Sequence, residues 1–182
     1  AAGAFSSYSF AGTKLHIPHG IGKRTSIFPL SHCYISMAKE IEHKYMVRDD
    51  SYKSMATGSE EIIQGYIDRT PEHVVRVRRR GERCYLTIKG RNNGDTRLEF
   101  EYEIPATDFD GLLSLCVGRI LHKRRWLVPF GGFLWEVDEY GGDLSGLTMA
   151  EIEIPASDAT YPLPPFIGRN VTDDPNYYNS NL

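Results

Sequence analysis

Acidic residues recur at every second position in several segments of the chain. This spacing occurs in Glu40-x-Glu42, Glu99-x-Glu101-x-Glu103, Glu136-x-Asp138 and Glu151-x-Glu153. If these segments are β-strands, alternate residues lie on one face with Cα atoms roughly 6.5 Å apart, and long carboxylate side chains can converge on one cation. A site made only of oxygen ligands suits Mg²⁺ or Mn²⁺.

Basic residues show the same spacing in other segments. Arg76 and Arg78 form one pair, and Lys123 and Arg125 form another. Arginine binds phosphate oxygens through its planar fork, and lysine binds them as a point charge. Together with the paired carboxylates, these residues predict a polyanion that binds with its metal, as phosphoryl transfer requires. The six histidines do not cluster, which disfavours a zinc site.

The segments that carry these pairs have the pattern of an antiparallel β domain. From Met37 onward, apolar and polar residues alternate and are interrupted by turns that contain glycine and aspartate. Eight strands are expected, near residues 40–48, 61–68, 73–80, 83–90, 96–105, 120–129, 133–140 and 147–154. One long helix is expected from Thr107, which forms a capping-box pattern with Asp110. After Pro155, the proline-rich chain predicts an irregular strap with a short helix or turn.

Each predicted strand divides into an apolar face and a charged face. The charged faces carry seven bases and nine acids: Lys44, Arg76, Arg78, Lys89, Arg97, Lys123, Arg125, Glu40, Glu42, Glu99, Glu101, Glu103, Glu136, Asp138, Glu151 and Glu153. A face that only meets solvent usually contains Ser, Thr and Asn as well. Closure of the sheet into a barrel would turn these charges inward. Because an unpaired buried charge costs several kcal/mol, such an interior must hold water, ions and a highly charged ligand.

Composition places these strands in one globular domain. The chain has 182 residues and a formal net charge of −3, with 41% apolar and 25% charged residues. No apolar run reaches the roughly 18 residues of a membrane span, so no membrane partner is expected. Cys33, Cys84 and Cys116 lie too far apart for a disulfide framework. Their spacing favours a reducing compartment, and we expect a cytoplasmic location.

The first part of the chain differs from the rest in its charge. Residues 1–39 contain four bases and no acid, and the first carboxylate is Glu40. We expect a leader at residues 1–36 that is non-native, follows from an upstream start or is transit-like. The tunnel domain is then expected at residues 37–182.

The segment Glu40-Ile41-Glu42-His43-Lys44 resembles the E-x-E-x-K signature of the CYTH superfamily, the triphosphate tunnel metalloenzymes. Seven further segments resemble the successive strand motifs of its short bacterial members: Gln64-Gly65-Tyr66, Val75-Arg76-Val77-Arg78, Leu86-Thr87-Ile88-Lys89-Gly90, Arg97-Leu98-Glu99-Phe100-Glu101, Lys123-Arg124-Arg125, Trp135-Glu136-Val137-Asp138 and Ala150-Glu151-Ile152-Glu153. The resemblance implies an α+β, mostly β fold, in which eight antiparallel strands form a closed barrel with a few helices outside. It also implies that the tunnel binds triphosphate on basic side chains and divalent metal on carboxylates.

On this basis we expect metal-dependent hydrolysis of a linear triphosphate, with inorganic tripolyphosphate giving pyrophosphate and phosphate. The expected ligands of Mg²⁺ or Mn²⁺ are Glu40, Glu42, Glu151 and Glu153. The expected phosphate-binding residues are Lys44, Arg76, Arg78, Lys123 and Arg125. Lys89 is the expected catalytic lysine, coupled to Tyr66 if surrounding cations lower the pKa of either group. Further tunnel-lining residues are expected at Arg97, Glu99, Glu101, Glu136 and Asp138.

The sequence is also compatible with other functions. Hydrolysis of thiamine or nucleoside triphosphate is one, and a class IV-type adenylate cyclase is another. A non-catalytic module that binds polyphosphate or RNA ends is the alternative outside the enzymes. Residues 40–182 carry 17 basic and 24 acidic side chains, which disfavours a nucleic-acid partner. The expected partner is a small-molecule triphosphate, and a homodimer is left open.

Overall fold

The computed structural model describes residues 38–93 and 96–182. The predicted leader at residues 1–36, with Cys33, lies outside the described residues. Among the described residues, no helix has the length and apolar character that a membrane span requires.

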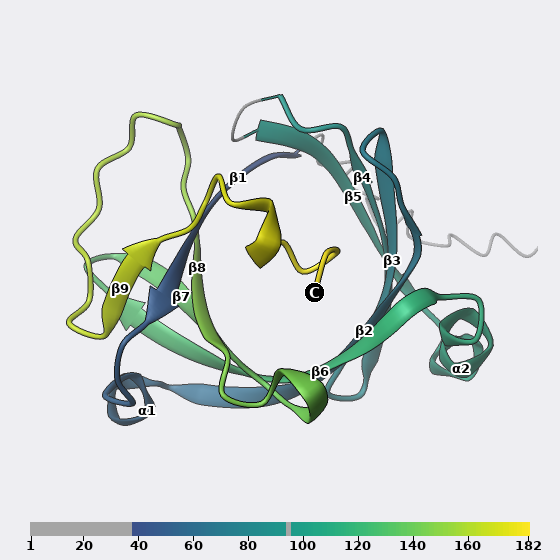
Figure 1. Ribbon diagram of the computed structural model, residues 1–182, viewed down its shortest axis with the longest axis horizontal. Coiled ribbons are helices and arrows are strands. Elements are labelled where there is room, and N and C mark those ends of the chain that lie inside the picture. The colour runs from purple at the N-terminus through teal and green to yellow at the C-terminus, as the bar shows by residue number, and fades with distance from the viewer. Residues whose placement is uncertain (1–37, 94–95) are drawn as a thin grey trace, which may run out of the picture. The chain divides into compact units, whose positions relative to one another are not determined.

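Eight antiparallel strands close into a barrel (Figure 1). In chain order they are β1 (Ala38–Val47), β2 (Gly58–Arg69), β3 (His73–Arg80), β4 (Arg83–Gly90), β5 (Thr96–Ile104), β6 (Val117–Phe130), β7 (Phe133–Tyr140) and β8 (Thr148–Glu153). Neighbours around the barrel follow the order β5-β4-β3-β2-β6-β7-β8-β1, and pairing of β1 with β5 closes it. The predicted eight-stranded closed barrel is therefore confirmed. We call its interior the tunnel.

A ninth strand and several short helices lie outside the predicted set. The strand β9 (Ile167–Asn170) pairs with β1. The helices are α1 (Tyr52–Met55), η1 (Ala106–Asp108), α2 (Phe109–Leu113), η2 (Gly142–Leu144) and η3 (Pro175–Tyr177). The last of these agrees with the predicted short helix or turn in the strap.

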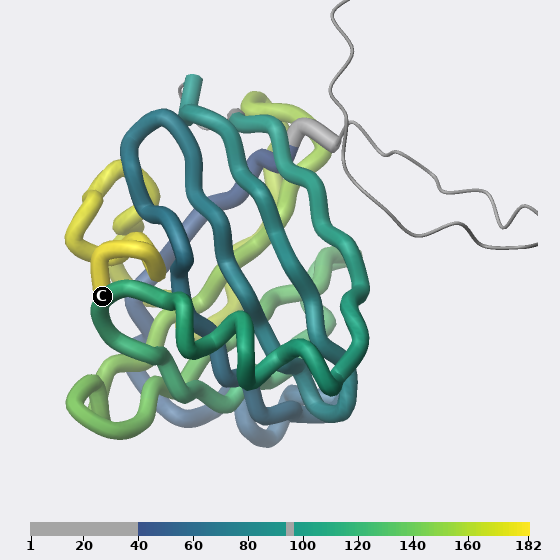
Figure 2. The backbone as a smooth tube through the Cα atoms, turned by 90° about the vertical axis from the view of Figure 1, so that its right-hand side faces the viewer, coloured from purple at the N-terminus to yellow at the C-terminus, as the bar shows by residue number. Residues whose placement is uncertain are grey.

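The long helix predicted from Thr107 is wrong. Only the five residues of α2 are α-helical, and the N-cap residue Asp108 makes no side-chain hydrogen bond to the helix. Because β6 begins at Val117, the chain must return to the sheet directly after α2. Figure 2 shows this connection crossing the outer surface of the strands. Its apolar residues thus pack over the barrel wall as part of a short connection and do not extend into a long helix.

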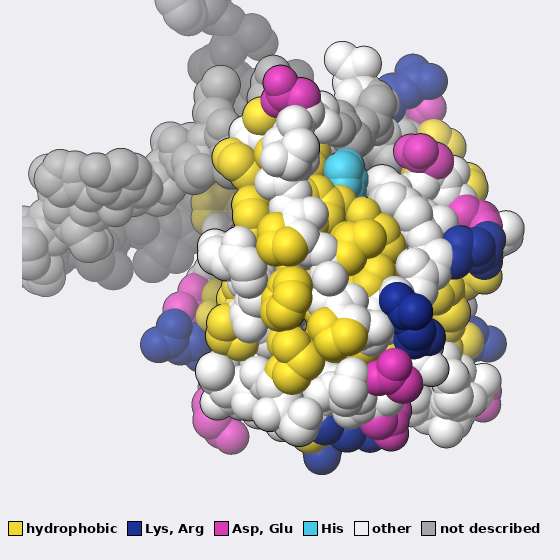
Figure 3. Space-filling view, turned by 90° about the vertical axis from the view of Figure 1, so that its left-hand side faces the viewer, with side chains coloured by type: hydrophobic (Ala, Val, Ile, Leu, Met, Phe, Trp, Pro, Cys, Tyr) yellow, Lys and Arg dark blue, Asp and Glu magenta, His cyan; other side chains and the backbone are white. Residues whose placement is uncertain are grey.

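The apolar core lies on the outer side of the barrel wall. One part gathers Trp135, Val137 and Ile152 under Phe166 and Tyr52. Another places Phe109 of α2 against Val77 and Cys84. Figure 3 shows apolar side chains collected on the face that the proline-rich strap crosses. Because the interior carries the charges, burial of these outward-facing apolar residues provides most of the hydrophobic stabilisation.

Candidate active site

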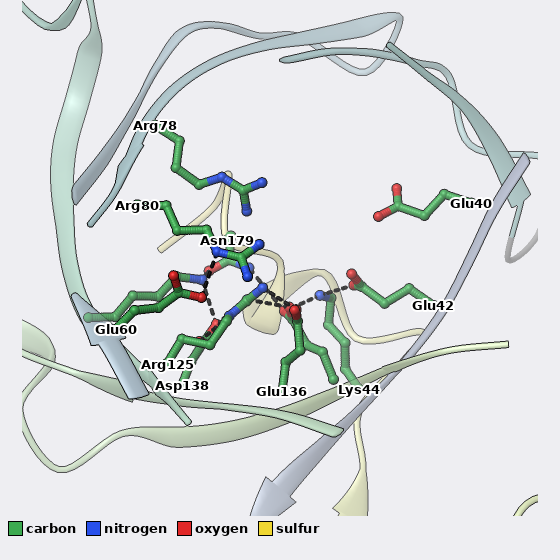
Figure 4. A network of polar contacts seen from close by, with 12 residues as sticks. Glu40, Glu42, Lys44, Glu60, Arg78, Arg80, Arg125, Glu136, Asp138 and Asn179 are labelled. Atoms are coloured by element: carbon green, nitrogen blue, oxygen red, sulfur yellow. Dashed lines mark hydrogen bonds and ion pairs between the residues drawn. The ribbon is translucent and has the colours of Figure 1, made fainter. Parts of the chain in front are cut away.

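The charged faces of the strands line the tunnel, as strand periodicity predicts. Eight of their charged side chains are buried: Lys44, Arg76, Arg78, Lys89, Lys123, Arg125, Asp138 and Glu151. Figure 4 shows basic and acidic side chains from several strands directed toward one another across the interior. In the described part of the chain, their ion pairs fall into three networks, of which the second and third are joined by the pair of Arg76 with Glu99 at 3.7 Å.

The first network joins β1, β6, β7 and β8. Lys44 contacts Glu42 and lies 2.5 Å from Glu151, measured from Nζ to Oε1. Arg125 contacts Glu136, binds both oxygens of Asp138 at 2.7 Å, and reaches Glu151 at 3.0 Å. Six buried or half-buried charges thus share partners, which holds their side chains in one arrangement before any ligand binds.

The second network joins β3, β4 and β5. The Arg78 guanidinium donates to Glu101 at 2.8 Å, and that of Arg76 donates to the same carboxylate at 3.2 Å. Thr87 also donates to Glu101 at 2.8 Å. Burial and the neighbouring Arg76 lower the pKa of Arg78 to about 10. The two guanidinium groups are thus close enough to repel each other, and an anion in the tunnel would relieve this repulsion.

The third network lies where β1, β4 and β5 meet. Lys89 contacts Glu40 at 2.9 Å and Glu99 at 2.7 Å, and Arg97 contacts Glu40 at 3.1 Å. Burial and the hydrogen bond with Glu40 raise the pKa of Glu99 to about 7. Burial opposes ionisation of Glu40, but the hydrogen bond from Glu99 and the charges of Lys89 and Arg97 hold its pKa well below the usual range.

The four predicted metal ligands lie close to one another in the sheet but do not form a ready-made site. Glu42 is the Cα partner of Glu153, and Glu42 and Glu151 meet at the amine of Lys44. Within the described residues, no three acidic, histidine or cysteine side chains are arranged as a metal cluster. Burial and repulsion from Glu40, Glu136 and Glu42 raise the pKa of Glu153. Crowded carboxylates of this kind fit a hard divalent cation, because its charge relieves their repulsion.

The structure does not couple Lys89 to Tyr66. Lys89 is bound by two carboxylates, whereas the Tyr66 hydroxyl accepts a hydrogen bond from Gln64 at 2.8 Å. Burial raises the pKa of Tyr66 to about 12 and outweighs the nearby cations Arg76 and Lys44. The condition set for Tyr66, a pKa lowered by surrounding cations, is therefore not met, because desolvation of a buried phenolate dominates.

Lys123 is the most deeply buried lysine of the tunnel, at 2% exposure. Burial lowers the pKa of Lys123 to about 8, even though its amine lies 2.5 Å from Asp138. A pKa near neutrality keeps part of the amine uncharged at physiological pH. Lys123 was predicted from the sequence only as a phosphate-binding residue, since spacing carries no information on burial.

Several tunnel residues were not predicted. Arg80 donates to Glu60 at 2.5 Å. Strand parity could have identified both, because Arg80 continues the face of Arg76 and Arg78 on β3, and Glu60 shares the face of Gln64 and Tyr66 on β2. Asn179 comes from the C-terminal strap, which lies across the barrel in Figure 1. Its amide contacts Tyr140 at 2.6 Å, Glu151 at 3.1 Å and Lys123 at 3.4 Å. No periodic signal marks an asparagine in such an irregular segment.

Comparison with known proteins gives consistent matches. The family model of the CYTH domain matches residues 38–178. An inorganic triphosphatase of Acetivibrio thermocellus is 48% identical over 147 residues, which cover 80% of this chain and 94% of that protein. An inorganic triphosphatase of Nitrosomonas europaea is 31% identical, with coverage of 79% and 95%. The crystal structure of an inorganic triphosphatase superposes with a TM-score of 0.57 at 30% identity, covering 80% of this chain and 94% of that chain.

Proposed function

The chain belongs to the CYTH domain family, and on this premise we propose that it is a metal-dependent hydrolase that cleaves inorganic tripolyphosphate to pyrophosphate and phosphate. The observation that carries this proposal is the set of buried basic side chains around the tunnel, each held by carboxylates. A linear triphosphate matches such a lining because it brings several anionic oxygens and a divalent cation together.

When a triphosphate binds, phosphate oxygens would replace carboxylates as the partners of the basic side chains. We propose that Lys44, Arg76, Arg78 and Arg125 hold the phosphates and spread positive charge over the transition state. For Lys123, which the sequence predicted as a further phosphate-binding residue, we propose the role of a base instead. Glu99, Glu101, Glu136 and Asp138 keep these cations in position, as their present contacts do. Arg97 contacts Glu40 instead, and so holds one of the proposed metal ligands. The basic groups labelled in Figure 4 already point into the tunnel, so they need only turn from their carboxylate partners to the phosphates.

Enzymes of this family depend on a divalent metal, and we propose Mg²⁺ or Mn²⁺ for this chain. Glu40, Glu42, Glu151 and Glu153 would hold it. When bound, the metal neutralises phosphate oxygens and favours ionisation of water. In the hydrolysis, water oxygen forms a bond to a terminal phosphorus, the bridging phosphoanhydride bond breaks, and pyrophosphate leaves with the bonding electrons. The proton of the water must pass to a base.

We propose Lys123 as this base, and Lys89 as the lysine that organises Glu40 and Glu99. Hydrolysis by the wild type is then expected to rise as pH increases through about 8, because only the neutral amine accepts a proton. Lys123→Arg stays charged and should lose this rise in a pH–rate profile. Lys89→Arg should keep it, and the exposed Lys53→Arg is the control. If Lys89→Arg alone abolishes the rise, Lys89 is the base, as its predicted catalytic role would require.

The proposed preference for tripolyphosphate over larger triphosphates rests on the apolar packing at one end of the tunnel. Tyr66, Leu121, Tyr140 and Met149 pack together there, with Tyr177 and Leu182 of the strap against them. These contacts occupy the apolar surface that a thiazole or nucleobase would need.

A parallel assay tests the substrate. Phosphate release from tripolyphosphate, thiamine triphosphate and ATP should favour tripolyphosphate, and cyclic AMP formed from ATP would overturn the hydrolase. Tight binding of tripolyphosphate without turnover would support a binding module instead.

The partner is a small-molecule triphosphate. We propose that nucleic acid is not a partner, because six basic side chains of the described residues are buried in the tunnel and so are not available on an exposed stripe. We also propose a cytoplasmic location and a homodimer, and sedimentation velocity would test the latter.

A further inference from the structure

Gln64 is a buried polar residue on the tunnel face of β2 that the proposed mechanism does not yet use. Its side chain is fully enclosed, at 0% exposure. Its Nε2 donates to the Tyr66 hydroxyl at 2.8 Å, while its Oε1 is buried and has no hydrogen-bond partner among the described residues. A buried carbonyl oxygen without a donor costs about 1–3 kcal/mol. An apolar side chain of similar size would avoid this cost, so the amide calls for an explanation.

A matching donor without an acceptor lies on the neighbouring strand. Arg78 is the Cα partner of Gln64 in the β2–β3 pair, so their side chains are on the same face and about 5 Å apart at Cβ. The Nε of Arg78 is also buried without a partner, whereas its Nη2 is bound to Glu101. Figure 4 shows the Arg78 side chain extending into the tunnel. Gln64, whose Oε1 lacks a donor, is therefore the cross-strand neighbour of Arg78, whose Nε lacks an acceptor.

We infer that Gln64 is a positioning residue that links the phosphate-binding Arg78 to the hydroxyl of Tyr66. Nε2 of Gln64 occupies a lone pair of the Tyr66 oxygen, so the hydroxyl proton points away from Gln64 and is free to donate to a phosphate oxygen. When the Arg78 guanidinium turns from Glu101 to the substrate, its Nε donates to Oε1 of Gln64. This inference rests on the proposed function, because it requires a triphosphate in the tunnel.

The link acts on turnover through the tyrosine. Charge is spread over the equatorial phosphate oxygens in the transition state, and a donor whose direction is already set stabilises that charge without reorganisation. Gln64 itself touches no phosphate. Its removal should therefore lower kcat more than it raises KM, and only while the Tyr66 hydroxyl is present.

A double-mutant cycle tests the link. Gln64→Met keeps the side-chain length but neither hydrogen bond, and kcat for tripolyphosphate should fall about fivefold to tenfold. In the Tyr66→Phe background, the same substitution should change kcat less than about twofold, because the hydroxyl that it orients is absent. Tyr102→Phe, on an exposed tyrosine of β5, is the matched control for loss of a phenol hydroxyl.

Gln64→Glu gives a second, isosteric measurement if Gln64→Met does not fold. The carboxylate can accept from Arg78 but also accepts the Tyr66 proton, which turns the hydroxyl away from the substrate. Its kcat should fall as in Gln64→Met, with a thermal midpoint close to that of the wild type. The inference is overturned if Gln64→Met lowers kcat by the same factor in the wild type and in the Tyr66→Phe background. A Gln64→Glu variant with wild-type kcat would also overturn it. Failure of the wild type to hydrolyse tripolyphosphate would instead overturn the proposed function.

Discussion

The Arg125→Ala variant is expected to lose both tripolyphosphate hydrolysis and a large part of its stability. Arg125 contacts Glu136, Asp138 and Glu151, and Asp138 is completely buried. Removal of one partner of a buried ion pair leaves an uncompensated charge and costs about 3–5 kcal/mol. Loss of a cation that we propose to bind phosphate should also lower kcat about 100-fold or more. Urea denaturation and phosphate release measure the two effects on the same sample.

The adjacent residue provides a matched control for Arg125. Arg124 lies on the outer face of β6, where its side chain is 50% exposed and pairs with Glu61, itself 65% exposed. Surface pairs of this kind contribute about 0–1 kcal/mol, so Arg124→Ala should keep the wild-type midpoint and rate. Equal stability of the two alanine variants would contradict the assignment of Arg125 to a buried network.

Glu42→Gln is expected to show the second large effect, on the metal requirement. Glutamine keeps the shape of the side chain but removes one negative charge from the group of Glu42, Glu151 and Glu153, which we propose as metal ligands with Glu40. At a fixed Mg²⁺ or Mn²⁺ concentration, activity should fall by at least about 100-fold. Loss of a residue that only hydrogen-bonds a metal ligand already costs about 10-fold to 100-fold, and loss of the ligand itself should cost more. Higher metal concentrations should restore part of the rate.

Metal titrations of activity and calorimetric binding of Mg²⁺ and Mn²⁺ measure this change directly. Glu61→Gln removes the same charge from the outer face of β2 and is the control. A Glu42→Gln enzyme with a wild-type half-saturating metal concentration would show that this carboxylate is not a ligand. Both metals should be tested, because the oxygen donors suit either ion.

Most of the barrel could be predicted because strand structure is encoded locally. The bounds of β3, β4 and β7 agree with the predicted ranges, and the alternation of Val75, Arg76, Val77 and Arg78 identified which side chains face inward. A helix is less secure when its signal is short. At Thr107 the capping pattern and apolar stripe favoured a long helix. Because β6 already begins at Val117, the stretch between them holds only the five α-helical residues of α2.

The sequence by itself determined the strands, the closed barrel that its family resemblance implied, and the face of each strand that carries charge. These follow from side-chain direction, which alternates along any strand whatever surrounds it. Only the tertiary structure decided which charges meet: Lys89 with Glu40 and Glu99, Arg125 with Asp138 and Glu151, and Gln64 with Tyr66. It also brought Asn179 from the C-terminal strap to Lys123. Partners and pKa values depend on the register between distant strands and on burial, and neither is contained in the spacing of residues along one strand.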